Sequence, residues 1–162
     1  MILENLYHYS SEKDLKLCEN YRKFQEIIHF KPTGFWVSVE AFDDDQTWFT
    51  WCQSEGFGLE RLKYKYHVKL KKSAKILHIG FSDQLTEFGK ENIYDPIYIN
   101  KLKGIYYIDW SSTYKNYDGI VIAPYQWNCR YGDHIWYYTW DCASGCIWNI
   151  DAIEKIELID EF

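Results

Sequence analysis

Short segments with the patterns of β-strands make up much of the chain, and turn residues bound several of them. In Tyr64–Leu70, aromatic and aliphatic side chains alternate with polar ones, which is the two-residue period of a strand with one buried face. Phe35–Val39 follows a turn at Lys31–Gly34, and the apolar run Gly119–Ala123 ends at Pro124. The short spacings between such segments predict a mainly antiparallel sheet. Further strands are expected over Ile2–Tyr9, Lys75–Ile79 and Ile153–Ile159.

A few helices are expected among these strands. Ser11 and Asp14 resemble a capping box, and residues at helical spacing follow as far as Ile28. The acidic run Asp43–Asp45 is expected to cap a second helix, which ends at Gly56. We therefore predict an α+β fold: one domain over residues 1–162, with a mainly antiparallel, split β-sheet and a few short helices. Two shorter helical segments are expected over Ser82–Phe88 and Ser111–Tyr117.

Charge and composition argue against several classes of protein. A net charge of -6 and a pI near 5.3 disfavour a protein that mainly neutralises duplex nucleic acid. The basic segment Arg61–Lys75 is an exception, but its alternation favours a strand with a solvated lysine face. No apolar run approaches the ~20 residues of a membrane span, and Met1–Ser10 lacks the regions of a signal peptide. Five cysteines without a secretory signal indicate a reducing compartment, so we expect a cytoplasmic protein.

The segment Trp136–Asn149 concentrates three tryptophans, two tyrosines and two cysteines. A zinc site is one interpretation, because Cys129, His134, Cys142 and Cys146 lie within eighteen residues and are ligands that Zn²⁺ prefers. The spacing has no Cys-x-x-Cys pair, the intervening segment reads as strand, and cysteine is itself a frequent core residue. We therefore expect no metal.

A cysteine nucleophile is a second interpretation of the same segment. Cys142 or Cys146 could combine with Asp141 and a distant histidine to form a catalytic set. The carboxylate beside Cys142 would raise the pKa of its thiol, which argues against a reactive thiolate. The favoured interpretation is that both thiols are buried and structural.

Five short segments lie in order over nearly the whole chain: Leu6–Ser10, Gly34–Glu40, Trp48–Trp51, Tyr64–Val68 and Tyr117–Pro124. Together they resemble the ADP-ribosyltransferase fold, and in particular small bacterial and viral members of its histidine-tyrosine-glutamate branch. This resemblance implies an enzyme that cleaves the nicotinamide glycosidic bond of NAD and transfers ADP-ribose to a macromolecule or to water.

The resemblance also implies roles for residues near the N-terminus. His8, in the sequence LYHYS, matches the histidine that binds the ribose of NAD, and Tyr9 follows it. Trp36, in GFWVSVE, stands where the family has the tyrosine that stacks on nicotinamide. Ser38 lies two residues further on, and therefore on the same face of the strand. An indole is well suited to stack on a flat cation such as nicotinamide.

The family's late glutamate has no direct counterpart. Ala143–Ile153 resembles the strand that carries it, but Ser144 stands near its position. A serine hydroxyl can hold a ribose oxygen, yet it brings no charge to offset the positive charge that develops as the C–N bond breaks. Asp141 is the first candidate for the missing carboxylate, and Glu40 and Glu55 are the others.

The predicted site therefore joins the two ends of the chain around NAD or a related nucleotide. Arg130 or a lysine of the basic segment is expected at the pyrophosphate, and Trp140 is expected to stack or pack. The acceptor macromolecule is left open. Two alternatives also stay open: a non-catalytic nucleotide- or ADP-ribose-binding module, and a zinc-bound structural adaptor. The predicted catalytic residues are His8, Asp141 and Ser144, and the predicted cofactor-binding residues are Tyr9, Trp36, Ser38, Arg130 and Trp140.

Overall fold

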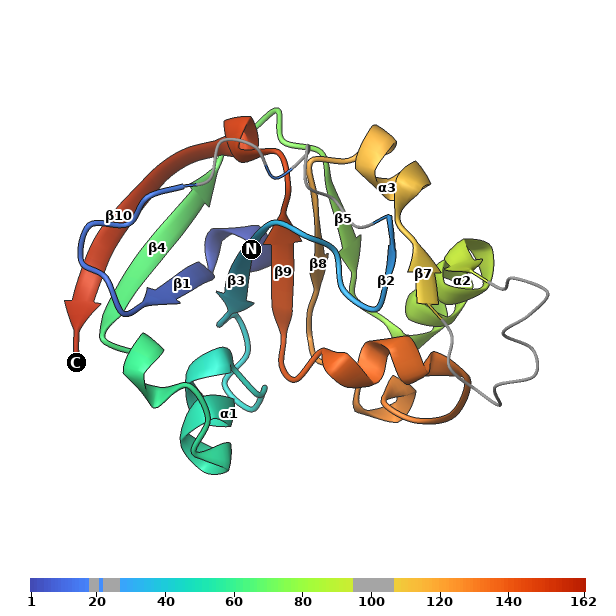
Figure 1. The fold of residues 1–162 in the computed structure, drawn as a ribbon, viewed down its shortest axis with the longest axis horizontal. Coiled ribbons are helices and arrows are strands. Elements are labelled where there is room, and N and C mark those ends of the chain that lie inside the picture. The colour runs from blue at the N-terminus through green and yellow to red at the C-terminus, as the bar shows by residue number, and fades with distance from the viewer. Residues whose placement is uncertain (18–20, 22–26, 95–106) are drawn as a thin grey trace.

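The computed structural model describes residues 1–17, 21, 27–94 and 107–162, and a seven-stranded sheet runs through its centre (Figure 1). The strand order is β10-β4-β1-β3-β9-β8-β5. Its neighbours pair antiparallel, apart from β5 and β8, which are parallel. The predicted α+β class with a mainly antiparallel sheet is thus confirmed. The strands are β1 (Leu6–Ser10), β3 (Phe35–Val39), β4 (Tyr64–Leu70), β5 (Ile76–Ile79), β8 (Gly119–Ile122), β9 (Ser144–Ile147) and β10 (Ile153–Glu161).

A small second sheet and several short helices complete the described part of the fold. The second sheet has the order β2-β7-β6, and Figure 1 shows it on the side of α2 and α3. Within the described ranges, no helix is long and apolar enough to cross a membrane. The strands are β2 (Ile28–His29), β6 (Ile93–Tyr94) and β7 (Tyr107–Asp109), and the α-helices are α1 (Trp48–Glu55), α2 (Ser82–Asn92) and α3 (Ser111–Asn116).

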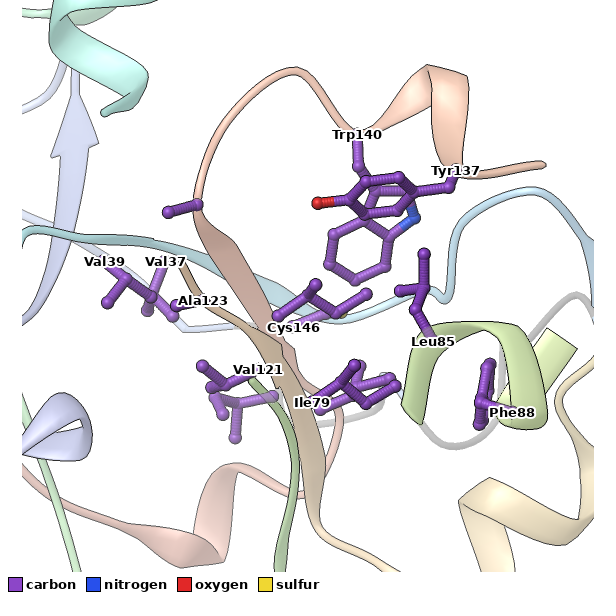
Figure 2. Packing of buried hydrophobic residues seen from close by; sticks show 14 of the residues in the cluster. Val37, Val39, Ile79, Leu85, Phe88, Val121, Ala123, Tyr137, Trp140 and Cys146 are labelled. Carbon is purple, nitrogen blue, oxygen red and sulfur yellow. The ribbon is translucent and has the colours of Figure 1, made fainter. Parts of the chain in front are cut away.

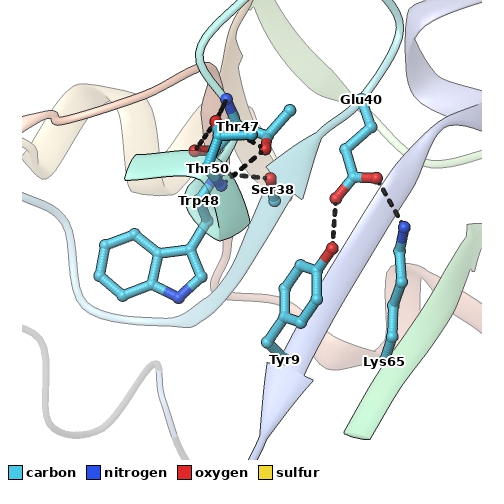
Figure 3. Close-up of polar contacts among 7 residues, drawn as sticks. All are labelled: Tyr9, Ser38, Glu40, Thr47, Trp48, Thr50 and Lys65. Atoms are coloured by element: carbon cyan, nitrogen blue, oxygen red, sulfur yellow. Dashed lines mark hydrogen bonds and ion pairs between the residues drawn. The ribbon is translucent and has the colours of Figure 1, made fainter. Parts of the chain in front are cut away.

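Helix α1 shows how local chemistry sets an element's ends. Its N-cap is Thr47, whose hydroxyl accepts a hydrogen bond from the Thr50 amide at 3.2 Å, so the prediction that Asp43–Asp45 cap this helix is wrong. Gly56 ends the helix at a φ of 62°, in the left-handed region that favours glycine, as predicted. The first helical amide, of Trp48, donates to Ser38 Oγ at 3.0 Å and thereby ties α1 to β3 (Figure 3).

The helix predicted between Ser11 and Ile28 is not found in the residues that the structure describes there. Ser11–Leu17 is irregular, Ile28 pairs with Asp109 in the small sheet, and most of the segment between them lies outside the described residues. Pairing with β7 thus overrides the helical spacing at Ile28. The first strand is also shorter than predicted, because Ile2–Glu4 forms a 3₁₀-helix.

Buried side chains pack against both faces of the central sheet (Figure 2). Val37 and Val121 point to one side in Figure 2, whereas Trp140, Leu85 and Cys146 lie on the other. The segment before Trp140, predicted to be strand, is instead the 3₁₀-helix Gly132–Thr139. Its rings, with Trp140, fill the core on the side of α2, so much of the aromatic block is structural.

Candidate functional site

A cavity of about 340 Å³ is lined by residues of β1, β3, α1 and the start of β9. Elements far apart in the sequence meet here because β3 lies between β1 and β9 in the sheet. Of the eight predicted site residues, Arg130 and Trp140 are not among those that line the cavity. The other six border it: His8, Tyr9, Trp36, Ser38, Asp141 and Ser144.

The register of the sheet explains why these residues meet. Ser38 pairs with Ser144 across β3 and β9, and with Tyr7 across β3 and β1, so these three side chains share one face of the sheet. The β1–β3 ladder comprises two residue pairs and ends at the pair of Tyr7 with Ser38. Beyond this pair, β1 and β3 are no longer joined by ladder hydrogen bonds, so side chains of both strands can border a cavity between them.

His8 borders the cavity with its ring held in a defined orientation. Strand alternation places Tyr7 and Tyr9, rather than His8, on the face of Ser38, and the His8 ring stacks on Phe35 with centroids 4.4 Å apart. His8 Nδ1 lies 2.8 Å from the Trp36 carbonyl oxygen.

Burial lowers the pKa of His8, against the opposing effect of that hydrogen bond, and so favours a neutral ring. A carbonyl oxygen can only accept a hydrogen bond. Nδ1 of His8 therefore carries the hydrogen and donates the bond to the Trp36 carbonyl oxygen. His8 Nε2 is then a hydrogen-bond acceptor, which suits a hydroxyl donor such as a ribose.

Trp36 brings an aromatic face and charge together. Its ring meets Trp140 edge-on, with centroids 4.9 Å apart, and Lys31 Nζ lies 5.4 Å from the Trp36 ring centroid. The same Lys31 Nζ is 3.7 Å from Asp141 Oδ2. Burial raises the pKa of Asp141, while the nearby Lys31 and Arg130 act to lower it. This part of the cavity can therefore hold a flat group that carries positive charge.

Two buried hydroxyls lie beside this indole. Ser38 Oγ accepts from the Trp48 amide, which leaves its own proton free to be donated to a ligand. The Ser144 hydroxyl donates to the Cys142 carbonyl oxygen at 3.0 Å, which leaves lone pairs on Ser144 Oγ to accept. Both serines are at most 7% exposed, so a ligand that meets them is shielded from water.

Glu40 and Glu55, the alternative carboxylates, do not line the cavity. Glu40 accepts a hydrogen bond from the Tyr9 hydroxyl at 2.7 Å and forms an ion pair with Lys65 Nζ at 2.7 Å (Figure 3). Glu55 is exposed at the end of α1. Asp141 is thus the single carboxylate among the described residues that line the cavity.

The cations at the cavity differ from those predicted. The Arg130 guanidinium carbon lies 5.0 Å from the Tyr138 ring and 5.9 Å from the Trp127 ring, outside the cavity lining. Arg61 and Lys31 line the cavity instead. Arg61 belongs to the basic segment, in which a lysine was predicted at the pyrophosphate and not this arginine.

The side chains that the structure describes support neither a cysteine nucleophile nor a zinc site. Burial, with a smaller effect of Asp141, raises the pKa of Cys142 to about 12, so its thiol stays protonated at neutral pH. Burial also raises the pKa of Cys146. Within the described side chains, no group of three or more histidine, cysteine or acidic residues could hold a metal ion. The side chain of His134, a predicted ligand in the zinc interpretation, lies outside that description.

Known proteins give no further guide to this cavity. The chain matches no protein-family model, no curated protein and no solved structure. What the cavity can bind follows from the side chains described above: an indole face, one carboxylate, two cations and two buried hydroxyls.

Proposed function

We propose that the chain binds NAD⁺ in this cavity, cleaves its nicotinamide glycosidic bond and passes ADP-ribose to a macromolecule or to water. One observation carries the proposal: six residues selected from the sequence for this function, between His8 and Ser144, border a single cavity. We also infer that the fold is of the ADP-ribosyltransferase type. The short ladder between β1 and β3 supports this inference, because its pairing ends at Tyr7 and Ser38, which line the cavity, while the two strands remain neighbours in one sheet.

Each end of the nicotinamide riboside has a partner in the proposed complex. In the proposed complex the nicotinamide ring stacks on Trp36. Its ribose hydroxyls bond to the Ser38 and Ser144 hydroxyls and to His8 Nε2, since all these residues line the same cavity. A volume of about 340 Å³ is near the lower end of ligand cavities, which span roughly 300–1,000 Å³. The phosphates and the adenosine therefore extend past the rim, where Arg61 is exposed.

The proposed reaction breaks the bond between the nicotinamide nitrogen and the ribose C1′. The bonding electron pair leaves with nicotinamide, which becomes neutral, and positive charge moves onto the ribose. The Asp141 carboxylate offsets that charge in a cavity of reduced water content. An oxygen or nitrogen of the acceptor, or a water molecule, then bonds to C1′ and loses its proton to solvent.

A nicotinamide-release assay tests the proposal with variants of matched size. Asp141→Asn is expected to lower kcat by roughly 10²–10³, the usual cost of removing one electrostatic contact to a developing charge. Glu87→Gln removes an exposed carboxylate of α2 that does not line the cavity, so it is the control and should retain full activity. Full nicotinamide release by a folded Asp141→Asn variant would refute the proposal.

A second candidate function is binding without turnover. The presence of Ser144 where the resembling family has its glutamate favours this candidate, since the hydroxyl brings no charge. Calorimetry with NAD⁺ and with ADP-ribose separates the two functions. A binding module would release heat with either ligand while nicotinamide release stays at the level of the blank.

A further inference from the structure

A positive charge already lies on the indole that the nicotinamide ring is proposed to use. Lys31 Nζ is 5.4 Å from the Trp36 ring centroid and 3.7 Å from Asp141 Oδ2. The first distance is within the range of a cation–π contact, and the second is that of an ion pair. Lys31 thus occupies the place of a cationic ligand, between an aromatic face and a carboxylate.

The geometry allows this ammonium group to leave. The Lys31 side chain is 35% exposed, so it reaches the cavity from its edge and is not enclosed within the core. Its charge is held by one carboxylate and one ring face, each of which is a weak contact when partly exposed. An entering cationic ring would need the same two partners, and two positive charges cannot share them without repulsion.

Resting on the proposed function, we infer that Lys31 determines specificity by exchanging places with the ligand. The ammonium group leaves Trp36 and Asp141 when a cationic ring enters, and it then binds a phosphate of the same ligand. A cation that carries no phosphate also displaces Lys31, but the displaced ammonium group then has no phosphate to bind, so this cation binds poorly. The cavity therefore selects ligands that join a flat cation to an anionic phosphate, as an oxidised pyridine nucleotide does.

The substitution Lys31→Met separates the two halves of this exchange, because it keeps the aliphatic stem and removes the charge. For the 1-methylnicotinamide cation, which lacks phosphate, the variant loses a competitor and should bind about 3-fold more tightly. For NAD⁺, it loses a charged contact to phosphate and should bind roughly 5-fold more weakly. Titration calorimetry with both ligands measures this change of opposite sign.

Two further variants control the experiment. Lys31→Arg keeps a cation at this position, so it should not reproduce the opposite shifts of Lys31→Met. Because a guanidinium stacks well on an indole, this variant should bind 1-methylnicotinamide no more tightly than the wild type does, and it should retain the contact to the phosphate of NAD⁺. Lys115→Met removes an exposed lysine of α3 that does not line the cavity, and it should change neither affinity.

The results distinguish failure of the inference from failure of the proposed function. Wild-type binding of NAD⁺ combined with shifts of the same sign for both ligands in Lys31→Met, or with no shift, overturns the exchange alone. A wild-type protein that binds no NAD⁺ overturns the proposed function and the exchange together. Circular dichroism of Lys31→Met before titration confirms that loss of binding does not reflect unfolding.

Discussion

Two ion pairs on strand β4 should differ greatly in their contribution to stability. Lys65 pairs with Glu40 at 2.7 Å, and both side chains are 19% exposed. Lys69 pairs with Glu154 at 3.0 Å, with side-chain exposures of 58% and 45%. The first pair also holds Tyr9, whose hydroxyl donates to the free oxygen of the Glu40 carboxylate, whereas the second pair lies in water.

Removing one partner leaves a charge that is costly only where it is buried. Loss of one partner from a fully buried pair costs about 3–5 kcal/mol. Because Lys65 and Glu40 keep some contact with solvent, we expect Lys65→Met to lower the free energy of unfolding by about 2 kcal/mol. Lys69→Met should cost between about 0.2 and 1 kcal/mol, the usual range for exposed pairs.

Urea unfolding of both double-mutant cycles measures the coupling within each pair. The Lys65→Met/Glu40→Gln cycle should give a coupling energy above about 1 kcal/mol, and the Lys69→Met/Glu154→Gln cycle should give less than about 0.5 kcal/mol. In 1 M salt the Debye length falls to about 3 Å, so the second coupling should disappear and the first should largely remain. Equal couplings at low salt would show that burial of Lys65 and Glu40 does not set the strength of their interaction.

Two further predictions follow from shifted pKa values. With its pKa raised to about 12, Cys142 should stay unmodified by iodoacetamide at pH 8 in the folded protein and react only after denaturation. Peptide mapping measures this labelling, and rapid labelling of the native protein would contradict the burial of the thiol. Because the pKa of His8 is lowered on folding, the unfolded chain binds more protons below its ordinary value of 6.5, so His8 should make the protein less stable as the pH falls from 7 to 5. The urea midpoint of His8→Gln should therefore fall less over this interval than that of the wild type, and parallel decreases would contradict the assigned direction.

Much of the sheet could be predicted because its strands carry their own signals. Tyr64–Leu70 and Phe35–Val39 were predicted with the bounds that β4 and β3 have in the structure. Local patterns failed where distant pairing decided the outcome, as at Ile28, which follows a helical spacing but pairs with Asp109. They also failed in the block around Trp136, which was expected to be strand but forms a 3₁₀-helix of eight residues, a length that is uncommon for this kind of helix.

The candidate site was predictable in its strand residues and less so in its charges. Trp36 was expected from the family resemblance, and the two-residue period of its strand then places Ser38 on the same face. Lys31 and Arg61 were missed because each lies outside the strands, on a segment whose path depends on the finished fold. Arg130 was expected at the ligand, but its guanidinium lies against Tyr138 and Trp127.

In the proposed enzyme, Asp141 takes the role that a strand glutamate has in the family that the sequence resembles. Pairing of β9 with β3 places Ser144 opposite Ser38, so a carboxylate three residues earlier must come from the segment that precedes β9. That segment is itself held in place, because the Ala143 amide donates to the Gln46 carbonyl oxygen at 3.0 Å and the Ala143 carbonyl oxygen accepts from the Val39 amide at 2.9 Å.

The Gln46 side-chain amide also donates to the carbonyl oxygen of Asp141, so the backbone of the acid is fixed from outside β9. The carboxylate itself is oriented by Lys31, which the ligand is proposed to displace. Asp141 would therefore become free to turn toward the ribose at the moment when the cationic ring arrives. In the proposed reaction, the fixed backbone therefore holds Asp141 in position. Displacement of the Lys31 ammonium group by the cationic ring frees the Asp141 carboxylate only when the ligand is bound.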